Sequence, residues 1–497
     1  MAPTDQVRSS APSVPGSLRA PAELIVVTHG TSAPLAPNVL RDSVAAEIRL
    51  SALLPAGARM TRIFGPAARL RGRLAETGEE PVAAEFLNYF AVRDIAADLE
   101  EVARRLREDD AVDGAYIKPG AELPIAPGSL ARRAFAEAPA VTPSFEARQG
   151  YLDAAPHGVD ARWAWTRPGG RGAGVRVIDI EGAWRFTHED LTGNQGGVIG
   201  GNPSTDAGWR NHGTAVAGEI SADVNAVGIT GIAPEATIRA VSIFGGGSAS
   251  AIRTAADALA PGDIILLELH RPGPRWNFRN RPDQSGYIAV EWWPDDLAAI
   301  RYATARGVVV VEAAGNGAED LDDAIYDVRP ADFPSTWRNP FRADAEGSGA
   351  VLVGAGAPPP GTHGREHGPA RSRLAFSNYG SRLDSQGWGM EVTTTGYGDL
   401  QGGGDEDYWY TDQFSGTSSA SPIVVGAIAC YQGIHAQGAG VRGPAEIRAL
   451  LRATGSPQAA APDRPTAQRI GTQPDIRAMV HDGEVPVANA ERTTDMA

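Results

Sequence analysis

The chain has 497 residues, of which 42% are hydrophobic and 21% charged, a composition typical of a soluble globular protein with more than one domain. The formal net charge of −15 argues against nucleic acid as a main partner. No uninterrupted apolar stretch is long enough to span a membrane, so no membrane partner is expected. Cys430 is the only cysteine, which excludes a disulfide within the chain.

Composition and hydrophobic patterning divide the chain into regions. The first 22 residues are rich in Ala, Pro and Ser and lack the apolar core of a signal peptide. We therefore expect a cytoplasmic location or leaderless export, or secretion if the true start of the chain differs. The predicted regions are a disordered N-terminus (1–22), a small α+β domain (23–141) with a linker to about 150, a main domain (151–482) and a polar tail (483–497).

The small domain is predicted from three apolar strands and one amphipathic helix. The helix is expected over 94–107, where Ile95, Leu99, Val102 and Leu106 fall on one face. The strands are expected over 23–28, 86–92 and 111–117.

The main domain alternates apolar strands with helical stretches. This alternation predicts an α/β fold in which helices cover both faces of a mostly parallel central sheet. In such sheets, functional groups gather at the carboxyl ends of the strands. The predicted strands are 175–179, 237–243, 263–269, 308–313 and 350–355.

A serine stands at the start of the most apolar helix of this domain. Ser418 lies in Gly416-Thr-Ser-Ser-Ala-Ser-Pro422, and the residues that follow have almost no polar face, which predicts a buried helix. The first N–H groups of a helix have no partner within it and carry a partial positive charge. A serine at this place is suited to be a nucleophile whose oxyanion is stabilised by the helix.

Three upstream residues are suited to support Ser418. His212 opens the run His212-Gly-Thr-Ala-Val-Ala-Gly218, Asp179 ends the first apolar strand of the main domain, and Asn316 follows a later one. A histidine can take the proton of the serine, a carboxylate can orient the imidazole, and an amide can donate to the oxyanion.

These segments resemble the subtilisin-like serine peptidases (the subtilases, peptidase S8 family), over about residues 151–480. The resemblance implies a three-layer subtilisin-like fold and a serine endopeptidase that hydrolyses protein or peptide substrates through an acyl-enzyme, with no cofactor needed for the chemistry. It implies a catalytic triad of Asp179, His212 and Ser418 with Asn316 in the oxyanion hole. The implied substrate pocket comprises Glu268, Leu269, Ala313 and Gly315.

The small domain resembles the propeptides that fold and inhibit such enzymes. On this interpretation the N-terminal domain is an intramolecular inhibitor, and the chain is cut within 118–144. The alternative is a plain accessory domain.

Three carboxylates depart from the family pattern. The run Asp179-Ile-Glu181 puts a second carboxylate on the same side of an extended chain, so Glu181 is an alternative orienting group. Glu268 stands where the family has a serine, and Glu312 lies in another apolar strand. One hypothesis is that Glu268 and Glu312 approach each other and share a proton or a cation. The other is that Glu268 only pins the substrate loop.

An extra stretch, 271–293, follows Glu268. Its aromatic residues are expected either to form walls of the substrate cleft or to pack beneath a long loop. They are Trp276, Tyr287, Trp292 and Trp293.

The resemblance also implies a structural calcium site, for which oxygen ligands from a loop are suited. The alternative is a plain surface loop. The implied ligands are side chains of Asp153, Asp190 and Asn225 and backbone carbonyls of Asp223, Val227 and Ile229.

Two other functions are kept open. One is a catalytically inactive relative that binds peptides in the cleft, which the altered Asp179 turn and Glu268 would explain. The other is a peptide ligase or cyclase that uses the same acyl-enzyme and excludes water.

Overall fold

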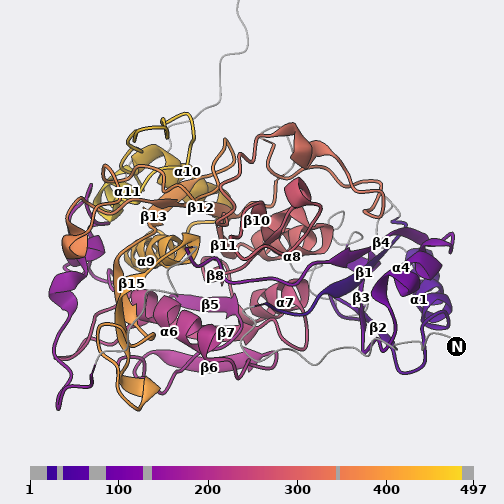
Figure 1. Cartoon of the computed structure of the whole chain (residues 1–497), viewed down its shortest axis with the longest axis horizontal. Coiled ribbons are helices and arrows are strands. Elements are labelled where there is room, and N and C mark those ends of the chain that lie inside the picture. The colour runs from indigo at the N-terminus through magenta and orange to yellow at the C-terminus, as the bar shows by residue number, and fades with distance from the viewer. Residues whose placement is uncertain (1–18, 31–36, 67–85, 127–136, 343–346, 484–497) are drawn as a thin grey trace, which may run out of the picture.

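Two β-sheets organise the molecule (Figure 1). The computed structural model describes residues 19–30, 37–66, 86–126, 137–342 and 347–483. Residues 1–18 and 484–497 lie outside the described residues. They contain most of the N-terminus predicted to be disordered and most of the predicted polar tail.

The smaller sheet is antiparallel, with strand order β2-β3-β1-β4. Helices α1 and α4 belong to the same domain. The predicted strands and helix are found, whereas α1 and β2 were not predicted. The elements are β1 (Glu23–Thr28), α1 (Pro37–Ser51), β2 (Arg59–Arg62), β3 (Tyr89–Arg93), α4 (Leu99–Arg107) and β4 (Val112–Lys118).

Helix α4 begins later than its apolar periodicity predicts. The Asp98 carboxylate caps it by accepting hydrogen bonds from the backbone N–H groups of Glu100 and Glu101. Asp94, at which the helix was expected to begin, has a positive φ of 57°, which a helix cannot contain.

The larger sheet has seven parallel strands in the order β13-β12-β11-β8-β5-β7-β6. It confirms the predicted parallel architecture. Its strands are β5 (Arg176–Glu181), β6 (Gln195–Gly200), β7 (Thr237–Ser242), β8 (Ile264–Leu267), β11 (Val309–Ala313), β12 (Val351–Gly356) and β13 (Ser385–Trp388).

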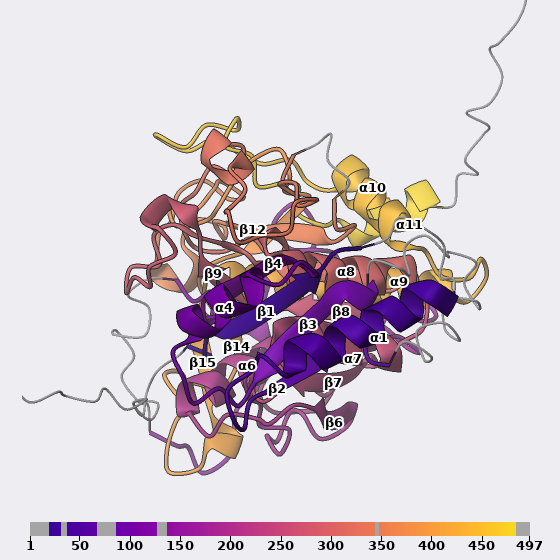
Figure 2. The same ribbon diagram turned by 90° about the vertical axis from the view of Figure 1, so that its right-hand side faces the viewer.

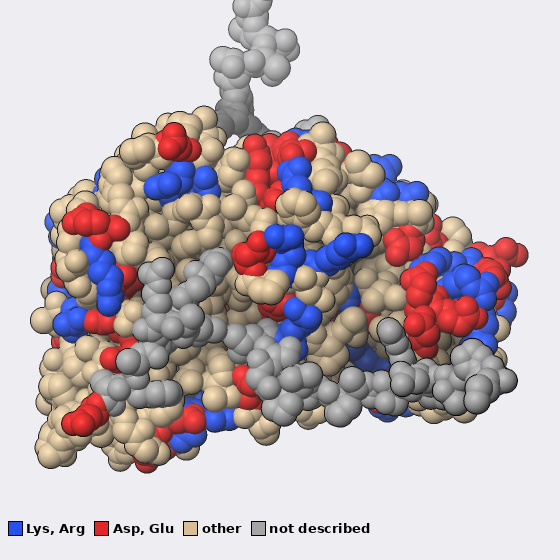
Figure 3. Space-filling model, viewed as in Figure 1, with Lys and Arg blue, Asp and Glu red and all other residues tan. Residues whose placement is uncertain are grey.

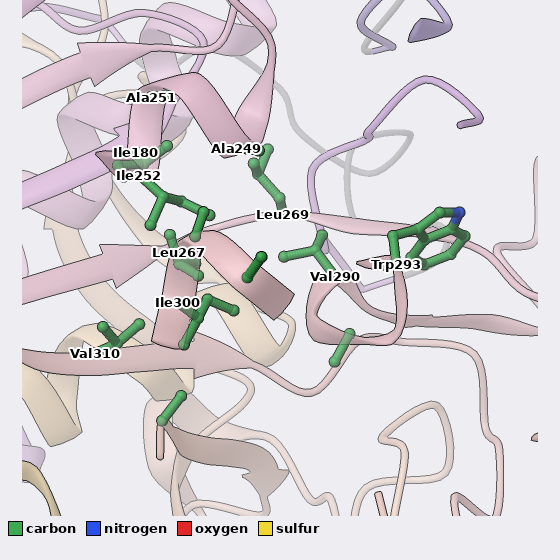
Figure 4. Close-up of a cluster of buried hydrophobic side chains, with 14 of the residues drawn as sticks. Ile180, Ala249, Ala251, Ile252, Leu267, Leu269, Val290, Trp293, Ile300 and Val310 are labelled. Atoms are coloured by element: carbon green, nitrogen blue, oxygen red, sulfur yellow. The ribbon is translucent and has the colours of Figure 1, made fainter. Parts of the chain in front are cut away.

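Helices cover both faces of this sheet. On one face, α6 (Ala207–Ser221), α9 (Thr417–His435), α10 (Pro444–Thr454) and α11 (Ile476–Gly483) share one hydrophobic core with β5, β8 and β11. On the other face lie α7 (Ser248–Ala258) and α8 (Pro294–Ala305). Figure 4 shows this second core, where Ile180 and Leu267 of the sheet meet Ile252 and Ile300 of the helices.

Three short elements complete the main domain. A short helix, α5 (Ala161–Ala164), precedes β5. Two small hairpins lie at the ends of the main strands: β9 (His270–Pro272) with β10 (Tyr287–Ala289), and β14 (Val392–Thr395) with β15 (Tyr410–Phe414).

The small domain packs on α7 and α8 and shares their hydrophobic core (Figure 2). Every residue of β1 is buried, because Leu24 and Val26 face α4 while Ile25 and Val27 face the main domain. Polar contacts seal the same interface: the Tyr116 hydroxyl donates to Asp295 at 2.9 Å.

Charges on the described surface are mixed. Figure 3 shows Lys and Arg beside Asp and Glu, and on this face the described residues form no continuous basic stripe. None of the helices in the described ranges is both long enough and apolar enough to cross a membrane.

Candidate active site

Ser418 is the second residue of α9 and is fully buried. The helix starts at Gly416, whose φ of 112° is open to glycine but strained for other residues. The Ser418 hydroxyl donates to the carbonyl of Pro124 at 2.9 Å. A Cβ on Gly416 would lie 1.9 Å from the same carbonyl oxygen, so glycine is required for this close approach.

His212 faces Glu181, not Asp179. Its Nδ1 lies 3.0 Å from both carboxylate oxygens of Glu181, and both side chains are fully buried. Because Nδ1 donates to Glu181, Nε2 is left as the basic nitrogen. The prediction that Asp179 orients the imidazole is therefore wrong, and the alternative, Glu181, takes that place.

The length of β5 explains this outcome. The strand was expected to end at Asp179, but its pairing with β7 continues to Glu181, which is in register with Ser242. Asp179 consequently lies one pleat deeper in the sheet. There one of its oxygens accepts a hydrogen bond from Trp184 Nε1 at 2.7 Å, and the side chain shares a hydrogen bond with Glu181.

The start of α9 is held beside His212. The imidazole packs edge-on against the ring of Phe414, with centroids 5.3 Å apart, and Phe414 ends the strand that leads into α9. Helix α6 is capped by the Asp206 carboxylate, which accepts hydrogen bonds from Gly208 N and Trp209 N. These contacts bring the predicted base and nucleophile to the same edge of the sheet.

Asn316 also lies at this edge, after β11. Its side-chain oxygen accepts hydrogen bonds from the backbone N–H and the hydroxyl of Thr417, each at 3.0 Å. Its Nδ2 donates to Gln284 at 3.4 Å. The amide oxygen is thus committed to the start of α9, and its Nδ2 faces Gln284.

A piece of the chain from the small domain occupies the site. Glu122 and His270 form an antiparallel bridge, with N–H to carbonyl distances of 3.0 and 3.2 Å. Gln284 donates to the Leu123 carbonyl at 3.0 Å, and the Glu122 carboxylate accepts from the Tyr287 hydroxyl at 2.8 Å. The segment 122–126, here called the cleft segment, therefore lies as an added strand with one carbonyl at Ser418. The sequence predicted a linker here but gave no signal for this docking.

Comparisons with known proteins agree with this geometry. The sequence profile of the subtilase family matches residues 187–471, which is more than half of the chain. Subtilisin BL of Lederbergia lenta is 30% identical over 265 residues, which cover 52% of this chain and 76% of that protein. An alkaline protease of Alkalihalobacillus alcalophilus is 29% identical over 265 residues, covering 52% of this chain and 54% of that protein.

The fold has a solved counterpart. Fervidolysin from Fervidobacterium pennivorans, a keratinolytic enzyme related to subtilisin, superposes with a TM-score of 0.53 at 18% identity, covering 95% of this chain and 62% of that one. This chain belongs to the subtilase family. The family and its relatives indicate a serine endopeptidase. The family match begins at residue 187, after Asp179 and Glu181, the region in which this subtilase departs from the pattern.

The predicted substrate pocket of this subtilase is filled by its own chain. Gly315 lies so close to the hairpin that a Cβ there would be 3.2 Å from the Tyr287 carbonyl and 3.4 Å from His270 Cβ. Leu269 and Ala313 are fully buried. The β9–β10 hairpin thus packs directly against the strand end at Gly315.

The aromatic residues of the extra stretch mostly serve packing. Tyr287, Trp292 and Trp293 are buried, and Trp292 stacks against Phe333 and Trp337 in the core. Trp276, at 44% exposure, is the most open of the four.

Glu268 and Glu312 do not approach each other. Glu312 is in register with Leu267, and side chains alternate along a strand, so Glu268 lies on the opposite face of the sheet. The hypothesis that these two share a proton or a cation is wrong. Glu268 faces α6 and α9, where its neighbours are Asp179, Glu219 and Ser421. Glu312 faces the other core and accepts a hydrogen bond from Glu291 N at 2.9 Å.

The residues of the implied calcium site do not fit a calcium ion. Asp190 accepts hydrogen bonds from Asn225 Nδ2, Ile229 N and the Tyr410 hydroxyl, at 2.7, 2.8 and 3.0 Å. Asn225 turns its amide oxygen to Val227 N at 2.8 Å. The side-chain oxygens of Asp190 and Asn225 that would bind the ion already accept protein hydrogen bonds.

The two other implied acidic ligands are engaged elsewhere. Asp153 pairs with Arg162 at 3.2 Å, and the carboxylate of Asp223, whose backbone carbonyl was the implied ligand, accepts from Thr192 N and Gly193 N. In the described part of the chain, no three His, Cys, Asp or Glu side chains are grouped to hold a metal ion. The calcium prediction therefore lacks a matching site.

Proposed function

We propose that this subtilase hydrolyses peptide bonds through a triad of Ser418, His212 and Glu181. The observation that carries the proposal is the bidentate contact between Glu181 and His212 Nδ1, because it fixes the tautomer that a general base needs. The Pro124 carbonyl at Ser418 supports it further, since it stands where the carbonyl of a substrate would stand.

The steps follow from the positions of these groups. Ser418 Oγ attacks the peptide carbonyl while His212 Nε2 takes its proton, and Glu181 stabilises the imidazolium that forms. The Ser418 N–H at the helix start and the Asn316 amide stabilise the oxyanion. His212 then gives the proton to the leaving amine, and water hydrolyses the acyl-enzyme by the reverse sequence of proton transfers.

The small domain is proposed to act as an intramolecular inhibitor. Its cleft segment pairs with His270 as an extended peptide substrate would, and it buries Ser418 completely. We therefore expect protein or peptide substrates that bind as an added strand. We expect any self-cleavage to occur between Pro124 and Ile125, because the Pro124 carbonyl faces the nucleophile.

Covalent labelling tests the triad. A fluorophosphonate probe should label the full chain on Ser418, and the Ser418→Ala variant should lose both the label and hydrolysis, with a loss on the order of 10⁶ in rate, the size known for subtilisin. Mass spectrometry of the incubated chain should find a new N-terminus at Ile125. Absence of labelling in protein that has been cut after Pro124 would overturn the peptidase proposal in favour of a peptide-binding relative.

A charge reversal tests the inhibitor. The Glu122 carboxylate accepts from Tyr287 at 2.8 Å and from Arg19 at 2.6 Å, so Glu122→Arg should weaken the docking of the cleft segment. Ser418 should then be labelled faster in uncut chain. Glu101→Arg, on the exposed side of α4, changes the charge of the same domain by the same amount and should leave the labelling rate unaltered. Equal rates in all three proteins would refute inhibition by this segment.

A further inference from the structure

Four carboxyl groups lie together behind the imidazole of His212. Asp179 and Glu181 share one face of β5, and Glu268 follows the neighbouring strand β8, with its N–H donating to the Ile180 carbonyl at 3.3 Å. Glu219 lies two turns after His212 on α6. All four side chains are fully buried. This group is called the carboxyl cluster below.

No lysine or arginine faces the cluster from the described elements around it. Strand β5 contributes Asp179 and Glu181, α6 contributes His212 and Glu219, and the β8 end contributes Glu268. The other polar groups that surround it are neutral. They are the Trp184 indole, the Tyr151 hydroxyl beside Glu219, and Ser421 of α9, whose own hydroxyl donates to Thr417 O.

Hydrogen bonding locates one proton in the cluster. Two carboxyl groups can share a hydrogen bond only if one of them is protonated. Both oxygens of Glu181 lie 3.0 Å from His212 Nδ1, an arrangement that favours the ionised form of Glu181, so its partner Asp179 is the group suited to donate. Asp179 accepts from Trp184 on its other oxygen, which leaves a continuous chain from the indole N–H through Asp179 and Glu181 to the imidazole.

Burial indicates that the other two members are neutral as well. Both oxygens of Glu219 and of Glu268 lack a hydrogen-bond donor among the described residues. An ionised carboxylate in such surroundings is very costly, so the group stays protonated. Burial accordingly raises the pKa of Glu219 and of Glu268 well above the ordinary value, and raises the pKa of Asp179 to about 7.

We propose that Asp179, Glu219 and Glu268 are positioning residues that act as neutral carboxylic acids. They leave Glu181 as the single negative charge behind His212, and hydrolysis stops when a second member of the cluster ionises. This inference rests on the proposed function. It predicts a peptidase that becomes active as His212 gives up its proton and loses activity reversibly as the pH rises further.

The loss has a physical cause. A second carboxylate would stand next to Glu181 in an apolar space that holds no cation, where like charges repel strongly. Ionised Asp179 could no longer donate to Glu181, so both carboxylates would move apart or admit water. Either change withdraws Glu181 from His212 Nδ1 and removes the orientation on which the base depends.

The test is the pH profile of Ser418 labelling. It uses the full-length protein after it has been cut following Pro124, with both fragments still present. The labelling rate of the parent chain should fall as the pH rises above about 7, and should recover on return to neutral pH. Asp179→Asn can donate to Glu181 and accept from Trp184 without ionising, so its fall should shift upward by about one pH unit or more. Asp179→Leu keeps the bulk but donates nothing, and should label at least about tenfold more slowly at every pH.

Two further variants protect the test against misfolding at one site. Glu219→Gln and Glu268→Gln should each move the alkaline fall upward while Ser418 is still labelled at neutral pH. Glu312→Gln is the matched control, because it removes a buried carboxyl of raised pKa from the opposite face of the sheet and should leave the profile in place. Profiles of Asp179→Asn, Glu219→Gln and Glu268→Gln that superpose on the parent profile refute the inference. Absence of labelling in the parent chain at every pH refutes instead the peptidase itself.

Discussion

Two groups of buried acids in this molecule have opposite surroundings. Asp384 and Glu291, near β12 and β13, both pair with Arg382 at 2.8 Å, and Asp384 also pairs with Arg448 at 3.1 Å and with Arg452. The carboxyl cluster behind His212 has no such cation among the described residues. The arginines hold the pKa of Asp384 below its ordinary value, whereas burial raises the pKa of every member of the carboxyl cluster.

The difference shows that burial alone does not decide the charge of a carboxyl group. All these acids are inaccessible to water, and the partner determines which form is stable. The Arg382 group is a network of ion pairs that ties helix α10 to the sheet. The carboxyl cluster holds protons, and only the member that receives the N–H of His212 is suited to be ionised.

The largest effect is expected from removing that one charge. Glu181→Gln should lower the rate of Ser418 labelling about 10⁴-fold, because an amide no longer stabilises the imidazolium and can impose the wrong tautomer. Asp384→Asn removes a charge from the other group and should leave the labelling rate of the folded protein unaltered. A larger loss in Asp179→Asn than in Glu181→Gln would return the orienting role to Asp179.

The second prediction concerns the stability of the fold and compares one substitution from each group. Arg382→Met leaves Glu291 and Asp384 without their shared cation in the protein interior, and should lower the free energy of unfolding by about 3–5 kcal/mol. Glu268→Gln removes no partner from any charge and should change it by less than about 1.5 kcal/mol at neutral pH. Urea denaturation of the two variants measures both values, and equal losses would contradict the assignment of charges.

The pH dependence of stability should separate the two groups. A lowered pKa means that Asp384 stabilises the fold above about pH 4 and that this contribution is lost as the pH falls through the folded pKa. The raised pKa of Asp179, about 7, has the opposite sign: its contribution is complete below about pH 4 and is lost as the pH rises from about 4 to about 7. Each group contributes at most about 1.4 kcal/mol per pH unit.

Melting curves from pH 3 to 10 would test this sign. Asp384→Asn should flatten the acid limb of the stability profile, below about pH 4, and Asp179→Asn should flatten the fall in stability between about pH 4 and pH 7. If Asp179→Asn altered the acid limb instead, the carboxyl cluster would have to be ionised in the folded protein.

Much of this architecture can be predicted from the sequence. Five of the seven strands of the large sheet follow from apolar runs, and Ser418, His212 and Asn316 were singled out by small-residue motifs that allow close approach. Which of Asp179 and Glu181 contacts His212 could not be predicted in the same way. Both lie on one side of the strand, and only the pairing with β7 decides where the strand ends. Glu219 was not predicted to lie near the site. Its spacing of seven residues from His212 places both on one face of a helix and could have indicated this.

Contacts between distant segments account for the other differences. The cleft segment reaches Ser418 across 294 positions of the chain, and no local pattern encodes such a contact. The opposite faces of Glu268 and Glu312 depend on the register between β8 and β11, which two apolar runs do not specify. The sequence places Asp190 and Asn225 in the pattern of a calcium loop. The Tyr410 hydroxyl that donates to Asp190 comes from the β14–β15 hairpin, far along the chain, and no local pattern predicts this contact.

Asp190 is a third kind of buried acid and gives the smallest predicted effect. Neutral donors surround it, and burial raises its pKa to about 6 despite the hydrogen bonds from Ile229 N, Asn225 and Tyr410. Tyr410→Phe removes one of these donors and should lower the free energy of unfolding by about 1 kcal/mol. Because the loop satisfies Asp190 without a metal, a calcium chelator should leave the melting temperature of the parent chain unchanged. A fall in melting temperature on chelation, reversed by added calcium, would show that Asp190 gives up these donors for an ion and would place it with the acids that depend on a cation.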